Sequence, residues 1–292
     1  MVSIIRRKKA GIDYYYLYHD SKGDTRQQHE AYLGKSIPPD IDAKKNDFML
    51  KILRKGWEPK LEIIRRRFAR ERASMPQTIR EKNLDAFAVR FTYHTQRIEG
   101  STLSLRDTAL LLADGITPPN RPIVDVLEAM SHRTVFFDAI KEEHMTQNRV
   151  TEWHREMFEG TKKDIAGKIR DYNVIVSQSE FVPPSHHAVG ILVGEFFEWY
   201  QANMKQMNPA ELAALVHLKF VTIHPFGDGN GRISRLMMNH VLHRSGYPML
   251  DIKYQDRRSY YAALERSQTK KVDWPFLRWF MRRYLRMHAR YL

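Results

Sequence analysis

Hydrophobic side chains recur at helical spacing along most of the chain. From about residue 43 onward the sequence consists of long segments with periodic apolar positions, for example Phe48, Leu50, Ile52 and Leu53. Such periodicity is typical of amphipathic helices. The sequence has no internal repeat and no low-complexity linker. We therefore expect a mainly α fold.

The first 45 residues follow a different pattern. Residues 12–18 are rich in tyrosine and poor in helix-forming residues, and residues 21–24 read Ser-Lys-Gly-Asp, which favours a turn. A second extended segment follows at residues 30–34, and Pro38 and Pro39 separate it from the helices. Two extended segments around a turn predict a small β-hairpin.

Two helices can be delimited in the last third of the chain. Asn208, Pro209 and Glu211 supply an N-cap, a proline at the first helical position and a capping-box carboxylate. Pro225 ends this helix, because the residue before a proline is pushed out of the α region. The next helix is expected from Asn230 to residue 244, with Gly246 after its end. His224 therefore lies on a loop between two helices.

The composition limits the chemistry that the chain can perform. There are no cysteines, so disulfides, thiolate metal sites and cysteine nucleophiles are excluded, and any metal must be held by oxygen or imidazole. No apolar run approaches the roughly 20 residues that span a bilayer, and the N-terminus lacks the features of a signal peptide. A cytoplasmic protein without a membrane partner is the expectation.

The formal net charge of +14 raises the question of nucleic acid. Basic surfaces bind nucleic acids by neutralising phosphates. No zinc finger or other recognised nucleic-acid motif is present. We favour the alternative, in which the basic residues solvate helical surfaces and attract acidic partners or a polyphosphate nucleotide.

Residues 225–231 have the features of an anion-binding loop. Glycines alternate through it, which allows backbone N–H groups to converge at the start of the following helix. Arg232 and Arg235 lie on one side of the first helical turn, where the helix dipole disfavours cations, so both need an anion. Asp228 is a hard oxygen ligand suited to Mg²⁺ (or Mn²⁺), and His224 can act as a base near neutral pH.

Each of these residues alone has an ordinary structural explanation. A histidine before proline, an aspartate before a helix and a glycine in a turn are common without any function. Their occurrence within twelve residues is what favours a site. The spacing is neither that of a P-loop nor that of a dinucleotide fingerprint.

Residues 224–235 read His-Pro-Phe-Gly-Asp-Gly-Asn-Gly-Arg-Ile-Ser-Arg, which resembles the Fic motif at every specified position. The resemblance implies a helical Fic core and transfer of AMP from ATP to a Ser, Thr or Tyr hydroxyl of a target protein. It implies that His224 is the base and Asp228 the metal ligand. It further implies a phosphate-binding set, with Arg235 on the γ-phosphate: Gly229, Asn230, Gly231, Arg232 and Arg235.

The similarity to Fic proteins extends over about residues 85–284. Residues 167–184 are similar to the β-hairpin flap that registers a target, and Val174, Ile175 and Val176 are expected to form a short strand with an edge free for a target backbone. A plain surface hairpin is the alternative. Downstream, Tyr260, Tyr261 and Leu264 resemble the wall beside the adenine, although a tyrosine pair in a helix is more often core.

A second short pattern lies ahead of the catalytic segment. Residues 95–100 resemble the Fic inhibitory helix, with Thr95, Glu99 and Gly100 at its specified positions. In the family this glutamate pairs with the second arginine of the motif, which here is Arg235. Glu99 also puts negative charge at the negative end of a helix, so it gains from a cationic partner. A solvent-exposed glutamate is the alternative.

These features predict three parts. Residues 1–45 are an N-terminal β-hairpin extension, residues 46–120 are N-terminal helices that include the inhibitory helix at about 84–100, and residues 121–292 are the catalytic core. Two other functions stay open: removal of AMP from a modified target, and a basic nucleic-acid-binding regulator that senses ATP, with the N-terminal hairpin as its binding element. Exposed apolar residues between 123 and 137 could form a homodimer face.

Overall fold

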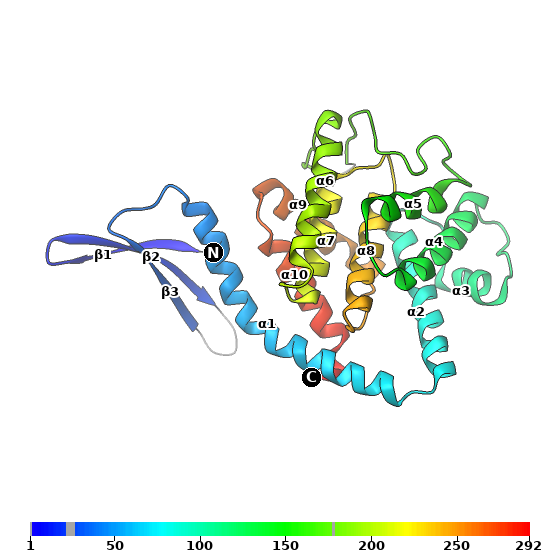
Figure 1. Cartoon of the computed structure of the whole chain (residues 1–292), viewed down its shortest axis with the longest axis horizontal. Helices are drawn as coiled ribbons and strands as arrows, with labels where there is room; N and C mark the ends of the chain where they lie inside the picture. The colour runs from blue at the N-terminus through cyan, green and yellow to red at the C-terminus, as the bar shows by residue number, and fades with distance from the viewer. Residues whose placement is uncertain (1, 22–26, 177–178) are drawn as a thin grey trace.

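The structure is a computed structural model, and it describes residues 2–21, 27–176 and 179–292. Ten α-helices form the body of this part of the chain, and three strands lie at its N-terminal end (Figure 1). The helices are α1 Ile41–Ser74, α2 Gln77–Ile98, α3 Leu105–Asp114, α4 Ile123–Lys141, α5 Gln147–Phe158, α6 His186–Asn203, α7 Pro209–Ile223, α8 Asn230–Arg244, α9 Arg257–Lys270 and α10 Trp274–Met287. The expected mainly α fold is confirmed.

The centre of the core is the helix pair α7 and α8. Apolar residues surround α7 on nearly all sides, and twelve of its fifteen residues are buried, which is typical of a central helix. Helices α6 and α10 pack on α7, whereas α2, α4 and α5 pack on α8. The predicted ends of both helices are confirmed, because α7 begins after the N-cap Asn208 and α8 ends just before Gly246, whose φ is 71°.

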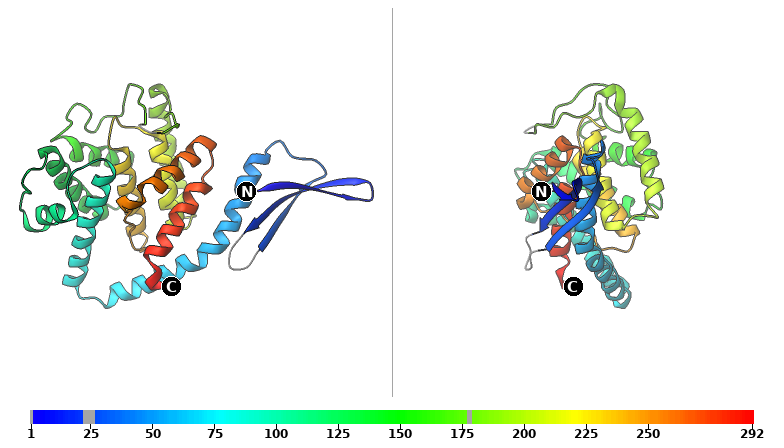
Figure 2. Two further views of the ribbon diagram at one scale, coloured as in Figure 1. Left: turned by 180° about the vertical axis from the view of Figure 1, so that it is seen from behind. Right: turned by 90° about the vertical axis from the view of Figure 1, so that its left-hand side faces the viewer.

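Helix α1 connects this core to the N-terminal strands. It has 34 residues and is therefore about 50 Å long. Its second half packs on the body through Trp57, Leu61 and Ile64, and Arg54 forms an ion pair with Glu211 at the start of α7. Its first half extends away from the body and ends beside the strands (Figures 1 and 2).

The N-terminal extension is a three-stranded antiparallel sheet and not a hairpin. β1 (Ser3–Lys9) pairs with β2 (Ile12–Ser21), and β2 pairs with β3 (Gln27–Gly34). The sequence analysis missed β1 because its residues 6–9 are all basic, and only pairing with β2 makes this segment a strand. Ala10 and Gly11, with φ of 49° and 82°, form the two-residue turn between them.

The predicted boundary at residue 45 also needs correction. Helix α1 begins at Ile41 and continues without a break past residue 46, so the boundary falls inside a helix. The chain changes from extended to helical at Pro38 and Pro39, because proline cannot continue the pairing of β3. Among the described residues, no helix combines the length and the apolarity that a bilayer crossing requires.

Candidate active site

His224 lies in the turn between the two central helices. It ends α7 in the left-handed conformation, with φ of 54° and ψ of 57°. Its Nδ1 lies 3.2 Å from the carbonyl oxygen of Val221, which accepts a hydrogen bond from the ring. Nε2 then carries the lone pair. Burial lowers the pKa of His224 below its usual 6.5, so the ring is neutral at pH 7 and Nε2 can accept a proton.

Asp228 is ionised and lies between two cations. Its Oδ2 is 2.6 Å from Nζ of Lys162 and 3.1 Å from the guanidinium of Arg232. Burial acts to raise the pKa of Asp228, but Arg232 and Lys162 outweigh it and lower the pKa to about 2. The carboxylate is therefore a fixed negative charge at the start of α8.

Arg232 is paired with a carboxylate that the sequence analysis did not identify. Its guanidinium forms an ion pair with Glu128 of α4 and lies 4.4 Å from the ring centroid of Phe158. Glu128 also contacts Lys162 at 2.9 Å. Two cations and two carboxylates therefore form one charge-balanced cluster, in which Arg232 and Glu128 are buried and Lys162 and Asp228 are partly exposed. Arg232 thus has its anionic partners within the protein. Through its contact with Asp228 it stabilises the loop that precedes α8.

Arg235 forms the predicted pair with Glu99. The distance between its guanidinium and Oε1 of Glu99 is 2.5 Å, and Arg235 is only 1% exposed. Helix α2 ends at Ile98, so Glu99 follows its last turn, and Gly100 has a φ of 104°. The hydroxyl and the carbonyl of Thr95 accept further hydrogen bonds from Arg235 at 3.3 and 3.4 Å.

Gly231 allows Glu99 to approach the first turn of α8. A Cβ atom at this position would lie 2.5 Å from Oε1 of Glu99, which is too close for any side chain. The carboxylate therefore lies against the N-terminal end of α8, where the helix dipole favours an anion. Among the described residues, no side chain caps this end of the helix. Glu99 thus lies where the phosphates of a nucleotide were expected.

Asn230 shapes the loop through its side chain. Its amide oxygen accepts a hydrogen bond from the N–H of Phe226 at 2.9 Å, and its amide nitrogen donates to the carbonyl of Phe226 at 2.8 Å. Gly229 precedes it with a φ of 78°. A Cβ on Gly229 would lie 2.3 Å from the ring of Phe158, so this glycine allows the loop to close onto α5. The N–H of Gly229 donates to Oδ1 of Asp228 at 2.5 Å. The backbone N–H groups of Asn230 and Gly231 are therefore left for an anion.

The expected adenine wall is mostly core. Tyr260 is 1% exposed, shares a hydrogen bond of 2.9 Å with His217 and lies 3.2 Å from a guanidinium nitrogen of Arg235. Leu264 is buried beside it, because residues four apart share one face of α9. Tyr261 points to the other side, is partly exposed and donates to the carbonyl of Ile98. Of the three, only Tyr261 lies on the surface near Glu99.

The expected strand at residues 174–176 is absent. Val174, Ile175 and Val176 have no strand conformation, and Ile175 is 91% exposed. Described strand pairing near this segment is limited to an isolated bridge between Ile169 and Phe226. β-branched residues favour a strand only where a partner is available, and none pairs with these three within the described part of the chain. Residues 177 and 178 lie outside the described residues.

Arg170 holds the two ends of this segment on the catalytic loop, a role that the sequence analysis did not assign. Its side chain is buried and donates three hydrogen bonds to backbone carbonyls: to His224 at 2.8 Å, Tyr172 at 2.9 Å and Pro184 at 2.6 Å. The segment is attached at its far side as well, because Glu265 of α9 accepts from the N–H of Glu180 at 2.7 Å. Residues 172–176 and 179–184 are therefore irregular but anchored.

His154 supports the loop from the opposite side. Its ring stacks on Phe226 at 3.8 Å, its Nδ1 accepts from the N–H of Gly167, and its Nε2 lies 3.0 Å from the carbonyl of Asp228. Burial lowers the pKa of His154 to about 4, so the ring stays neutral. No local pattern distinguishes Glu128, His154, Lys162 or Arg170 in the sequence, because each acts on residues far away along the chain.

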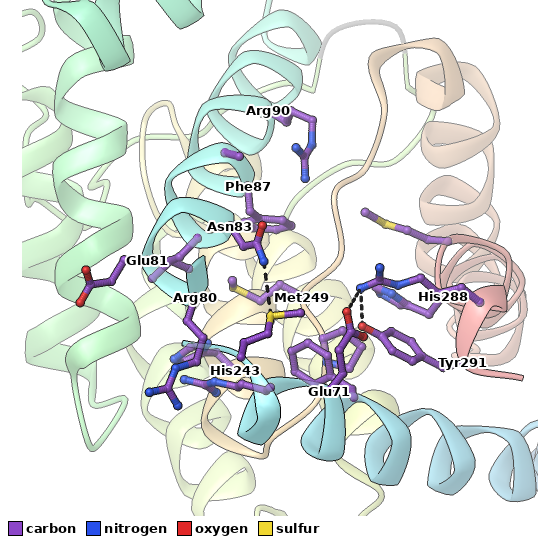
Figure 3. A pocket seen from close by; sticks show the side chains of 18 of the residues that line it. Glu71, Arg80, Glu81, Asn83, Phe87, Arg90, His243, Met249, His288 and Tyr291 are labelled. Atoms are coloured by element: carbon purple, nitrogen blue, oxygen red, sulfur yellow. Dashed lines mark hydrogen bonds and ion pairs between the residues drawn. The ribbon is translucent and has the colours of Figure 1, made fainter. Parts of the chain in front are cut away.

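A separate cavity of about 810 Å³ lies at the other end of α8. Figure 3 shows it between the turn that joins α1 to α2 and the C-terminal residues, with Arg80, Asn83, His243 and His288 among its lining. Glu71 pairs there with Arg290 at 3.1 Å. None of the residues expected in the active site lines this cavity, so it is not the nucleotide site.

The fold and the site define a helical protein in which a neutral histidine and an anion-binding helix N-terminus meet in one loop. Residues 144–242 match the Fic/DOC family. Over these residues the chain therefore matches a Fic domain, as the motif predicted.

Similar proteins agree with this assignment. The chain is 34% identical over 196 residues to the protein adenylyltransferase Fic of Nematostella vectensis, covering 65% of this chain and 45% of that protein. It thus spans less than half of the length of this relative. The structure resembles Fic-1 of Caenorhabditis elegans (residues 134–508), with a TM-score of 0.70 and 26% identity over 86% of this chain and 74% of that one. It also resembles a Fic-domain signaling protein of Bacteroides thetaiotaomicron, with a TM-score of 0.69 and 26% identity over 78% and 93%.

Proposed function

We propose that this protein is an autoinhibited adenylyltransferase that moves AMP from ATP to a Ser, Thr or Tyr hydroxyl of a target protein. The observation that carries the proposal is the ion pair between Glu99 and Arg235 at the N-terminal end of α8, with the neutral His224 in the same loop. The printed name of the Nematostella relative, protein adenylyltransferase, supports the reaction.

The chemistry requires a base, an anion site and a bound hydroxyl. Nε2 of His224 takes the proton of the target hydroxyl while the oxygen of that hydroxyl attacks the α-phosphorus of ATP. The bond between the α-phosphorus and the oxygen that bridges it to the β-phosphorus breaks, and pyrophosphate leaves. The N-terminal N–H groups of α8 stabilise the phosphates, and Arg235 holds the γ-phosphate once Glu99 releases it. Most of the acceleration comes from positioning and electrostatics.

Asp228 is the residue that would hold a metal ion. Its carboxylate is ionised, and a single carboxylate fits Mg²⁺ or Mn²⁺ that arrives with phosphate oxygens as its remaining ligands. No cluster of three or more acidic or histidine residues suited to a resident metal occurs within residues 2–21, 27–176 and 179–292. The metal would neutralise phosphate charge, and Lys162 would have to leave Oδ2 of Asp228 to admit it.

Glu99 is the proposed brake. Its carboxylate uses the same guanidinium and the same helix end that the γ-phosphate needs, so ATP and Glu99 compete. Tyr261 extends this contact, because its hydroxyl bonds the carbonyl of Ile98 just before Glu99. Movement of the last turn of α2 would release both. Thr95 and Gly100 position the carboxylate and are not part of the chemistry.

Removal of AMP from a modified target is the second candidate. The side chain of Glu99 is 25% exposed, so a water molecule can reach the carboxylate beside the catalytic loop. In this reaction Glu99 would orient the water and take a proton from it, and the imidazolium form of His224 would give its Nε2 proton to the departing oxygen of the target side chain. We expect this protein to lie in the cytoplasm, because its sequence contains no cysteine. This location stays a prediction.

The first experiment uses ATP labelled at the α- or the γ-phosphate, with Mg²⁺ and a cell lysate as source of targets. Wild type, Glu99→Gly and Glu99→Gly with His224→Ala are compared, and label retained on protein is scored. We expect strong α-label with Glu99→Gly, little with wild type and none with the double variant, and γ-label no higher than that which kinases produce in the lysate alone. Absence of α-label with Glu99→Gly, despite measured ATP binding, would refute AMP transfer from ATP.

Adding a target that already carries labelled AMP tests the second candidate. Loss of that label with wild type but not with Glu99→Gly would assign removal to Glu99. Equal retention with both proteins would exclude it.

A further inference from the structure

Four tyrosines gather on one face of the N-terminal sheet. Tyr14, Tyr16 and Tyr18 occupy alternate positions of β2, and Tyr32 of β3 pairs with Tyr16, so all four side chains share a face. The ring centroids of Tyr16 and Tyr32 are 5.2 Å apart, and those of Tyr14 and Tyr32 are 6.3 Å apart. Tyr32 is 56% exposed. The rings of Tyr14, Tyr16 and Tyr32 are in contact, and Tyr32 is exposed, whereas the tyrosines of β2 are half-buried.

Basic side chains of β1 border these rings. Arg7 pairs with Tyr14 and Lys9 pairs with Ile12, which places both on the tyrosine side. The guanidinium of Arg7 lies 5.0 Å from the ring centroid of Tyr16. Arg7 also contacts Glu30 at 2.5 Å, but this pair is exposed and contributes little in water. We call the set Arg7, Lys9, Tyr14, Tyr16, Tyr18 and Tyr32 the tyrosine face.

The tyrosine face points away from the rest of the protein. The opposite face carries Leu17, which is 2% exposed, and β2 contacts α1. A buried leucine on that side means that the opposite face packs against the start of α1. Figures 1 and 2 show the sheet beyond the helical body, at the far end of α1. The tyrosine face is therefore free of the active site and of the core.

The N-terminal sheet and the start of α1 carry a small net positive charge. Residues 1–45 contain 9 lysines and arginines against 6 aspartates and glutamates. Electrostatic attraction reaches about one Debye length, ~10 Å at moderate salt, so basic residues beside the rings, such as Arg7 and Lys9, are the ones that attract a polyanion to this face.

We propose that the tyrosine face binds single-stranded nucleic acid. Unpaired bases stack on the exposed rings, and the adjoining phosphates are neutralised by Arg7 and Lys9. A duplex fits this face less well, because its bases are already stacked on one another. An acidic peptide would satisfy the charges but would leave the rings without a stacking partner. This proposal is independent of AMP transfer, since no residue of the active site takes part.

Fluorescence anisotropy of a labelled oligo-dT of about 12 nucleotides with the full chain tests this, since such a length lies within the ~4–16 nucleotides that single-strand-binding modules cover. Tyr32→Ala is expected to weaken binding about tenfold, whereas Tyr32→Phe, which keeps the ring, retains it. Lys9→Glu is compared with Lys8→Glu. The two neighbours point to opposite faces and change the net charge equally. The plot of log affinity against log salt has a negative slope. Lys9→Glu is expected to make this slope shallower by about 0.7 or more, and Lys8→Glu by much less.

Three outcomes would overturn the proposal. The first is no binding at low salt. The second is equal loss with Lys8→Glu and Lys9→Glu together with no effect of Tyr32→Ala, which would leave only general attraction to polyanions. The third is tighter binding of a duplex of the same length, or equal competition by polyglutamate. Melting curves of all four variants establish that the sheet is folded, and Tyr32→Phe gives a ring-retaining reference.

Discussion

Replacing Glu99 is expected to raise activity and lower stability in the same protein. Arg235 is almost fully buried, and Glu99 is its carboxylate partner at 2.5 Å. Removing the carboxylate leaves a buried cation with only the neutral acceptors Thr95 and Tyr260. The two effects have one cause, because the group that stabilises Arg235 in the resting protein also keeps it from the γ-phosphate.

The expected size follows from the burial of the pair. A hydrogen bond between charged partners contributes about 1.5–3 kcal/mol, and we take about 1–2 kcal/mol here because a quarter of the Glu99 side chain is in solvent. For a domain of this size that lowers the melting temperature by about 2–8 °C. If the pair holds the resting state by the same amount, about 1–2 kcal/mol, its loss raises AMP transfer about five- to thirtyfold.

Glu99→Gln is the sharpest form of this test, because it keeps the size of the side chain and removes its charge. Melting by differential scanning fluorimetry and α-label transfer are measured on the same preparations. ATP with Mg²⁺ should raise the melting temperature of Glu99→Gln more than that of wild type. Arg54→Gln is the matched control, since it breaks an ion pair with the buried Glu211 far from the loop. The inhibitory role of Glu99 would be refuted if Glu99→Gln lowered the melting temperature as much as Arg54→Gln does but did not increase AMP transfer.

Four further outcomes are expected. Because burial lowers the pKa of His224 below 6.5, transfer by Glu99→Gly should stay constant from pH 8 to 6.5 and fall only at lower pH, as an initial-rate profile would show; a midpoint above 6.5 would contradict this. Arg170→Lys should lower kcat/KM about tenfold while ATP binding by calorimetry stays unchanged, since lysine cannot bond three carbonyls in one plane; an unchanged rate would remove its positioning role. Asp228→Asn should slow transfer about a hundredfold and raise the Mg²⁺ concentration needed for half-maximal rate; an unshifted Mg²⁺ titration would exclude it as the metal ligand. Leu127 lies in an exposed apolar stripe of α4, in which Ile123 is 63% exposed. Leu127→Asp should abolish any dimer seen by sedimentation, and a monomeric wild type would exclude the homodimer.

Local signals in the sequence located the loop and its two helices. The N-cap Asn208 and the breaker Pro225 act on neighbouring residues, and both helix ends lie where these signals put them. The glycines of residues 227–231 indicated close backbone approach. The structure adds what approaches them: Glu99 at Gly231 and Phe158 at Gly229. The motif thus identified the site and left its contacts open.

Contacts between distant segments could not be predicted from local patterns in the sequence. Arg232 is expected to hold phosphate, and in the structure Glu128, 104 residues earlier, forms a hydrogen bond with it. Tyr260 and Leu264 are expected beside adenine, and both lie in the core of the structure. Strand β1 was missed and the strand at 174–176 was wrong, because a strand requires a partner that local sequence does not reveal.

The sequence by itself determined the helical class of this protein and the twelve residues of its candidate loop, through short-range periodicity, capping and a highly specific motif. The pairing of Glu99 with Arg235 is expected from the resemblance to the Fic inhibitory helix, and the structure contains it. Only the tertiary structure decided that Arg170, His154, Glu128 and Lys162 support that loop, and that the tyrosines of β2 and β3 share an outward face. The physical reason is that ion pairs, hydrogen bonds and sheet register join groups far apart in the chain, and their partners become neighbours only when the chain folds.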